Sequence, residues 1–226
     1  MKKAFLILIA ITLIFSACKK GVDDFPNTPI NVGGATDAPF HPFRAGAKWV
    51  YIGRSGVGAL AVEDTRVMIT TGKTKEIDGD LFYEITTTRP TISATGYLGY
   101  NNGLYAQRAD NALYNADTMQ PIYNDNYEVG ELYIQPFSYL SQGQIVNARF
   151  NVELLEIGVT KTVRNKEYTD VAHTRVKIEI KLGNDWVSYS GNEFYLARGT
   201  GIILASAYAF DVEIDRMELA SYTPGL

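Results

Sequence analysis

From residue 40 onward, apolar and polar positions alternate with a period of two, which is the pattern of β-strands that bury one face. In residues 175–182 (RVKIEIKL) every even position is aliphatic and every odd position is charged, and residues 149–154 (RFNVEL) alternate in the same way. The pattern predicts that one face of each strand packs on a core while the other meets solvent. In the first segment the predicted buried residues are Val176, Ile178, Ile180 and Leu182.

Short turn sequences separate the predicted strands. Asp78-Gly79, Asn101-Asn102-Gly103 and Gly183-Asn184-Asp185 each lie beside or between strand-like runs. Loops this short can join only antiparallel neighbours. About ten strands at this spacing, without a long amphipathic helix, predict an all-β fold. We expect a single antiparallel β-domain that forms a barrel or a strongly curved sheet, with a two-sheet sandwich as the alternative.

The last predicted strand changes phase. Val212 and Ile214 have one parity, whereas Met217 and Leu219 have the other. Since every second side chain of a strand shares a face, an extra residue must be inserted between the two pairs. We therefore expect a β-bulge near Asp215-Arg216.

A faint internal repeat relates residues 72–89 to residues 158–175. At a shift of 86 positions the two segments share five residues, including a glycine at 72 and 158. Each copy has the pattern of a strand, a tight turn and a second strand. The repeat favours a two-part layout of the domain, although chance recurrence of hairpin residues explains it equally well.

The first eighteen residues follow another pattern. Lys2-Lys3 precedes an apolar run, Ala4–Phe15, in which Thr12 is the one polar residue, and Ser16-Ala17-Cys18 follows. A basic start, a short apolar run and small residues are typical of a secretory signal. The run is shorter than the roughly 20 apolar residues of a membrane-spanning helix. We predict a signal peptide at residues 1–17, with cleavage elsewhere or an uncleaved anchor as alternatives.

This segment resembles the lipobox of bacterial lipoproteins. The resemblance implies that Cys18 becomes the first residue of the mature chain and carries lipid, including palmitate, attached through its sulfur. Phe15 departs from the aliphatic residue that the lipobox prefers three positions before the cysteine. Lys19 stands where some bacteria place an aspartate that retains lipoproteins in the inner membrane. The expected location is therefore the cell envelope, at the outer membrane, with the periplasmic or surface face left open.

The stretch that follows the cysteine, residues 19–39, holds three prolines, three glycines and few large apolar residues. Residues 18–39 are predicted to be the lipidated cysteine and a flexible tether, and residues 40–226 to be the β-domain. Fully extended, the tether reaches ~70 Å. A flexible coil of the same length spans ~25 Å on average, so the domain can stand clear of the lipid headgroups.

Charge and cysteine content exclude two classes of protein. The chain has 21 Lys and Arg against 25 Asp and Glu, and the basic residues are scattered along the predicted strands. A protein that binds phosphate backbones gathers its basic residues on one face, so no nucleic-acid partner is expected. The single cysteine is assigned to lipidation, which leaves no disulfide to stabilise the fold.

Residues suited to catalysis or metal binding are few. The chain has two histidines, His41 and His173, far apart in sequence. A hydrolase needs a nucleophile, a base and an orienting group, and zinc sites usually gather several His or Cys ligands. Asn124-Asp125-Asn126 offers oxygen ligands but lacks the spacing of an EF-hand loop. We predict no catalytic residue, no metal and no cofactor, and therefore no enzyme.

Tyrosines crowd one part of the chain. Eight of the 15 tyrosines lie between Tyr97 and Tyr139, interleaved with Asn and Gln. Aromatic rings beside amides suit a sugar-binding surface, because the rings cover the C–H faces of a pyranose and the amides bind its hydroxyls. The alternative is that these rings pair across strands in the core. The predicted ligand-binding residues are Tyr105, Tyr114, Tyr123 and Tyr127.

Both ends of the β-domain carry short motifs. Residues 42–51 (PFRAGAKWVY) and 194–202 (FYLARGTGI) resemble the opening F-x-x-G-x-x-W-x-Y and the closing A-x-G-x-G of a widespread set of β-rich secreted proteins and lipoproteins, many from Bacteroidota. The resemblance implies a fold and a location, and no activity.

These observations favour a lipid-anchored outer-membrane lipoprotein that acts as a non-enzymatic binding or envelope module, for glycans or peptides. A carrier that holds a lipid or another apolar ligand inside the barrel is the alternative, since barrels of about eight strands can enclose a ligand. A hydrolase is the third option. The membrane is the expected partner through Cys18, and the oligomeric state is left open.

Overall fold

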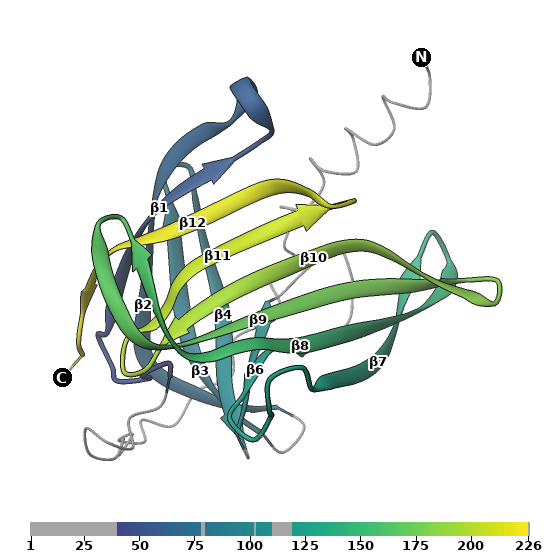
Figure 1. The fold of residues 1–226 in the computed structure, drawn as a ribbon, viewed down its shortest axis with the longest axis horizontal. Coiled ribbons are helices and arrows are strands. Elements are labelled where there is room, and N and C mark those ends of the chain that lie inside the picture. Colours follow the sequence, from purple (N-terminus) through teal and green to yellow (C-terminus); the bar gives the residue numbers. More distant parts are fainter. Residues whose placement is uncertain (1–39, 78–79, 102, 110–118, 226) are drawn as a thin grey trace.

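The computed structural model describes residues 40–77, 80–101, 103–109 and 119–225, which form one antiparallel sheet curled into a half-barrel (Figure 1). The prediction of an all-β, strongly curved single sheet is confirmed, and the two-sheet alternative is wrong. The strands are β1 (Lys48–Ser55), β2 (Val62–Ile77), β3 (Asp80–Arg89), β4 (Ile92–Asn101), β5 (Leu104–Ala109), β6 (Gln120–Asn124), β7 (Leu132–Ser141), β8 (Gln144–Val163), β9 (Lys166–Leu182), β10 (Asp185–Ala197), β11 (Gly201–Ala209) and β12 (Val212–Thr223), with a 3-10 turn, η2 (Gly58–Leu60), between β1 and β2.

The sheet consists of two meanders of sequential strands. Its order is β6-β5-β4-β3-β2-β1-β12-β11-β10-β9-β8-β7. The pairing of β1 with β12 therefore joins the meander β1–β6 to the meander β7–β12. The 12 strands exceed the predicted number because the short strands β5 and β6 have too few residues to show a clear alternation.

The internal repeat lies at equivalent places of the two meanders. Residues 72–89 span β2 and β3, and residues 158–175 span β8 and β9, so each copy supplies the second and third strand of its meander. Gly72 and Gly158 both have positive φ, at +85° and +71°, and both lie at a shift of the strand register. The position of the copies supports the two-part layout.

The two end motifs meet in the structure. The indole nitrogen of Trp49 donates a hydrogen bond to the Thr200 carbonyl oxygen at 2.6 Å, and the Tyr51 hydroxyl donates to the Ile202 carbonyl oxygen at 2.8 Å. A Cβ at Gly201 would lie 2.3 Å from a ring nitrogen of His41, so only glycine fits there. The two motifs that carry the resemblance therefore contact each other, and they join β1 to the start of β11 and the turn before it.

The concave face of the sheet packs on a core that fills the half-barrel. Phe40 and Phe43, which precede β1, are buried inside it. The edge strand β6 contacts β9, because the Thr174 hydroxyl donates a hydrogen bond to the Ile122 carbonyl oxygen at 2.7 Å. This core includes Ile85, Leu98, Tyr105, Tyr123, Phe150, Val152, Leu154, Val176, Ile178, Phe194, Leu196 and Ile202.

The predicted buried face of β9 is confirmed over half of its length. Val176 and Ile178 are buried, Ile180 is half-buried and Leu182 is 55% exposed. The far ends of β9 and β10 run beyond the curled part of the sheet (Figure 1), so the last positions have no opposing layer to cover them.

The predicted irregularity in β12 is also present. Asp215 pairs with Ala207, whereas Glu213 pairs with Tyr208, so Ile214 is the extra residue. The bulge lies directly before the predicted position, and it explains the change of parity along the strand.

The tip of the long β8–β9 hairpin covers part of the sheet's outer face. Lys161 places its ammonium 4.0 Å from the ring of Tyr195 on β10, and Arg164 lies 3.9 Å from a carboxylate oxygen of Glu218 on β12. Val163 is buried in a second apolar cluster together with residues of β1, β11 and β12.

The predicted signal and tether, residues 1–39, lie outside the described residues. In the described part of the chain, no helix has the length and apolar character needed to cross a membrane.

Candidate functional site: a groove on the outer face

The tyrosines predicted to bind a ligand are placed differently from one another. Tyr105 and Tyr123 are 2% and 1% exposed, and they pair across β5 and β6. The Tyr105 hydroxyl accepts a hydrogen bond from the Phe40 backbone N–H at 3.0 Å. Rings buried in this way belong to the core and present no face to a sugar. Tyr127 is half-buried beside Tyr133, and Tyr114 and Cys18 lie outside the described residues.

Asp125 lies among the hydroxyl groups of Tyr100, Tyr105 and Tyr123. Burial raises the pKa of the Asp125 carboxyl, while the three hydroxyls act in the opposite direction by stabilising the carboxylate. Burial raises the pKa of Tyr105 and Tyr123 well above the ordinary value of tyrosine, so both stay neutral. The side chains of Tyr100, Tyr105 and Tyr123 thus gather around one carboxyl group.

Neither histidine is arranged as a catalytic base. His41 is 3% exposed and stacks on Trp49 with ring centres 4.6 Å apart, and burial lowers its pKa to about 3. His173 stacks on Tyr195, and its two ring nitrogens face the carboxylates of Glu156 and Glu193 at 3.2 and 3.4 Å. Each imidazole is therefore held by packing or by carboxylates.

A small apolar void lies on the concave side of the sheet. The void beneath His41 and Phe43 has a volume of about 10 Å³, which is room for about one water molecule. The rest of its lining is Leu98, Gly99, Tyr105, Ile122, Leu196 and Ile202. This void is too small for the apolar ligand of the carrier hypothesis.

A larger hollow lies on the other side of the sheet, over β9, β10 and β11. This outer-face groove has a volume of about 300 Å³, at the lower end of the range for small-molecule sites. Its floor carries the small residues Ser188, Ser190 and Gly191 of β10. A Cβ at Gly191 would lie 3.0 Å from the Val176 carbonyl oxygen, so the backbone keeps this part of the floor bare.

Two irregularities of the strands shape the outer-face groove. The register of β10 against β9 shifts at Tyr189, which is the extra residue between Ser188 and Ser190. β11 ends before a tight turn in which Phe210 and Asp211 both have positive φ, and the Phe210 N–H donates to the Tyr189 carbonyl oxygen at 3.1 Å. β11 stops here, while β10 and β9 continue beyond it (Figure 1), so the turn lies beside the outer face of the longer strands.

The two walls of the outer-face groove differ in chemistry. Tyr208 and Phe210 form an aromatic wall, and Phe210 is 71% exposed. The opposite wall is formed by Arg175 and Lys177 of β9, with Glu193 of β10 at the same end as Arg175. Aromatic faces on one side and hydrogen-bonding groups on the other suit a ligand that has both apolar faces and polar edges.

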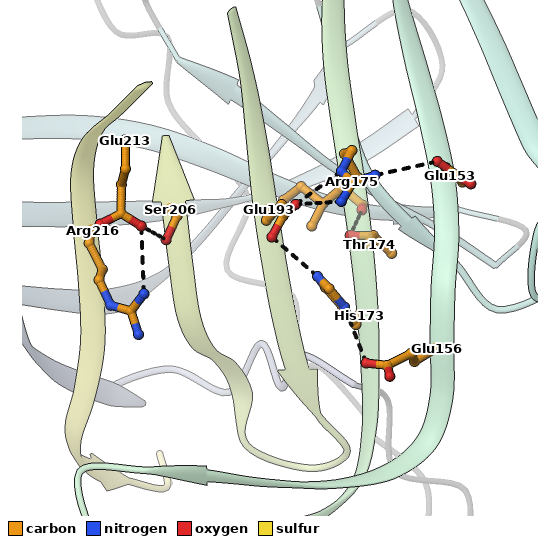
Figure 2. A network of polar contacts seen from close by, with 10 residues as sticks. Glu153, Glu156, His173, Thr174, Arg175, Glu193, Ser206, Glu213 and Arg216 are labelled. Carbon is orange, nitrogen blue, oxygen red and sulfur yellow. Dashed lines mark hydrogen bonds and ion pairs between the residues drawn. The ribbon is translucent and has the colours of Figure 1, made fainter. Parts of the chain in front are cut away.

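A polar network fixes one end of the groove (Figure 2). Arg175 donates to Glu193 at 2.9 Å and lies 4.0 Å from Glu153, and Glu193 also faces His173. On the neighbouring strands, Glu213 accepts a hydrogen bond from the Ser206 hydroxyl at 2.9 Å and lies 3.5 Å from Arg216. These pairs hold the charged side chains along the strands and leave the hollow beside them open.

Metal chemistry has no support in the described part of the chain. Residues 40–77, 80–101, 103–109 and 119–225 contain no group of three or more His, Cys, Asp or Glu side chains placed to hold a metal ion.

Reasoning from sequence did not find this groove. It draws on residues of three strands and a turn, and the tyrosine that forms its wall lies outside the tyrosine-rich segment. One local signal is present: the small residues of Ser188-Tyr189-Ser190-Gly191 interrupt the alternation of a strand whose neighbours alternate well.

No protein-family model matches the chain, and no curated protein sequence does either. A "putative lipoprotein" from Parabacteroides distasonis has a similar fold, with a TM-score of 0.51 at 11% identity over 82% of this chain and 99% of that chain. A "putative exported protein with YmcC-like fold" from Bacteroides fragilis gives a TM-score of 0.45 at 12% identity over 83% of this chain and 100% of that chain. The first likeness confirms, for the fold, that the chain resembles β-rich secreted proteins of Bacteroidota.

Proposed function

We propose that this chain is a lipoprotein of the bacterial cell envelope, anchored in the outer membrane through Cys18, whose β-domain binds glycans without catalysis. The observation that carries the binding part is the outer-face groove of about 300 Å³, with its bare floor and its aromatic wall. A sugar ring has apolar C–H faces that fit against Tyr208 and Phe210, and hydroxyls that reach Ser188 and the charged wall.

Three further observations support this choice. The interior void is too small for the ligand of a carrier. The described histidines contact carboxylates or aromatic rings rather than a nucleophile. The likeness in fold to a protein named as a lipoprotein supports an envelope location for this chain as well. Tyr127, the half-buried member of the predicted tyrosines, is the alternative place for the glycan.

The test is a glycan array with the full-length protein purified in detergent. Ser188→Trp is the decisive variant, because Ser188 is exposed and a tryptophan there fills the groove without entering the core. We expect at least a tenfold loss of affinity for the glycans that the wild type binds, with an unchanged thermal midpoint. Tyr127→Ala is the matched control and should retain binding.

Other outcomes are equally informative. Loss of binding in Tyr127→Ala with retention in Ser188→Trp moves the site to the tyrosine-rich segment. A wild type that binds short extended peptides but no glycan replaces the ligand class and keeps the groove. A wild type that binds neither overturns the binding module.

A further inference from the structure

One cation of the outer-face groove has no counter-charge. Arg175 is neutralised by Glu193 and approached by Glu153. Lys177, two residues further along β9, makes no ion pair within the described residues, and its side chain is exposed. An ammonium that lines a groove without a carboxylate partner is available to an anionic group of a ligand.

The strand pairing keeps this ammonium uncovered. Lys177 pairs with Gly191 on β10, which has no side chain to lie over it. The carbonyl oxygen of Val176, 3.0 Å from where a Cβ would lie, opposes any larger residue at that position. The backbone geometry that leaves the floor of the groove bare therefore also leaves Lys177 open toward the aromatic wall.

The other charges of the groove define where an anion can be bound. Glu193 is engaged by Arg175 and His173. Asp211 is exposed in the turn between β11 and β12, behind Phe210 in the chain. A ligand carboxylate is repelled by Asp211, meets an already neutralised pair at Arg175 and Glu193, and is attracted by Lys177. The charge pattern therefore specifies a position along the groove as well as a sign.

We propose that the outer-face groove selects acidic glycans, in which a sugar ring carries a carboxylate, and that Lys177 binds this carboxylate. The inference rests on the proposed function, since it names the class of glycan that the same groove binds. Tyr208, which stands on the opposite wall, covers a face of the same sugar ring. A long cationic stem suits this role because the Lys177 ammonium can follow the carboxylate within the groove.

The test compares two probes of equal length, an oligogalacturonate and the neutral galacto-oligosaccharide, by titration calorimetry with the full-length protein. The wild type should bind the acidic probe at least tenfold more tightly, and this preference should shrink as salt is raised, because ions screen an exposed pair. Lys177→Gln should remove the preference, so that the acidic and the neutral probe bind with similar affinity. Lys177→Arg should retain most of it.

Lys181→Gln is the control, because it removes an exposed cation of the same strand outside the groove. Equal affinity of the wild type for both probes, or a preference that survives Lys177→Gln, overturns this inference while the glycan-binding function stands. If neither probe binds while the array shows other glycans, the acidic class is likewise wrong. If no glycan binds at all, the proposed function fails first.

Discussion

His41 shows how the surroundings of one residue decide its chemistry. It is the histidine of a proline-flanked segment in the sequence, yet its ring is buried against Trp49 and both ring nitrogens lack a hydrogen-bond partner within the described residues. Burial disfavours the imidazolium and lowers the pKa of His41 to about 3, compared with 6.5 for an exposed histidine. The residue is a neutral core side chain at physiological pH.

This burial predicts a pH dependence of stability. Because the folded pKa of His41 is lower than the unfolded one, the unfolded chain binds more protons between about pH 6.5 and pH 3, and acid favours unfolding. His41 alone should lower the unfolding free energy by about 2 kcal/mol between pH 7 and pH 5. Urea titrations at both values should show this extra loss in the wild type and its absence in His41→Phe. Equal losses in the two proteins would contradict the neutral, buried assignment.

At the scale of elements, β9 alternates regularly, and its two faces have different roles. Its even positions face the concave side, where Val176 and Ile178 are buried by the curl of the sheet. Its odd positions face outward and supply the charged wall of the outer-face groove. One alternating segment therefore serves the core and the candidate site at the same time.

The phase of β9 can be tested by charge substitution. Ile178→Lys puts an ammonium among the apolar side chains of the described core and should cost about 3 to 5 kcal/mol of unfolding free energy. Lys181→Ala, on the exposed face, should change it by less than about 0.5 kcal/mol. Urea midpoints compare the two variants. Losses of similar size would refute the assignment of faces.

On the scale of the whole molecule, the two meanders are held together at the β1–β12 seam. Arg66 of β2 is 2% exposed and donates to both carboxylate oxygens of Asp215 on β12, at 2.6 and 2.7 Å, and to Asp64 at 2.8 Å. Its guanidinium lies over Gly53, where a Cβ would come within 2.0 Å of the Arg66 Nε atom. The joint thus unites residues from both meanders, while the candidate groove lies wholly in the second.

The proposed anchor is a property of the whole chain. Cys18→Ser removes the only thiol, so we expect no incorporation of a palmitate analogue and loss of the processed form. Each acyl methylene buried in a bilayer contributes ~0.8 kcal/mol, so a protein without acyl chains is held much less tightly by the membrane. Lys19→Ala, which keeps the thiol, should be labelled like the wild type. Equal labelling of Cys18→Ser would rule out lipidation at this residue.

Local patterns in the sequence predict much of the architecture. The alternation in 149–154 and 175–182, the short turns and the parity change before Met217 predicted an antiparallel, curved, all-β domain with a bulge in its last strand, because side-chain period and turn length depend only on nearby residues. The end motifs were also visible in the sequence. Their contact across Trp49 and Thr200 became apparent when the chain was folded.

Burial and concavity, in contrast, depend on which distant strands come together. Tyr105 and Tyr123 belong to a tyrosine-rich and amide-rich segment whose composition suits a sugar-binding surface. In the folded chain they pack in the core together with Phe40. Lys177 and Tyr208 are 31 positions apart and form opposite walls because β9, β10 and β11 are adjacent and β11 ends first. Whether a groove forms depends on which strands are neighbours and on where each of them ends. The periodicity within one strand contains no information about either.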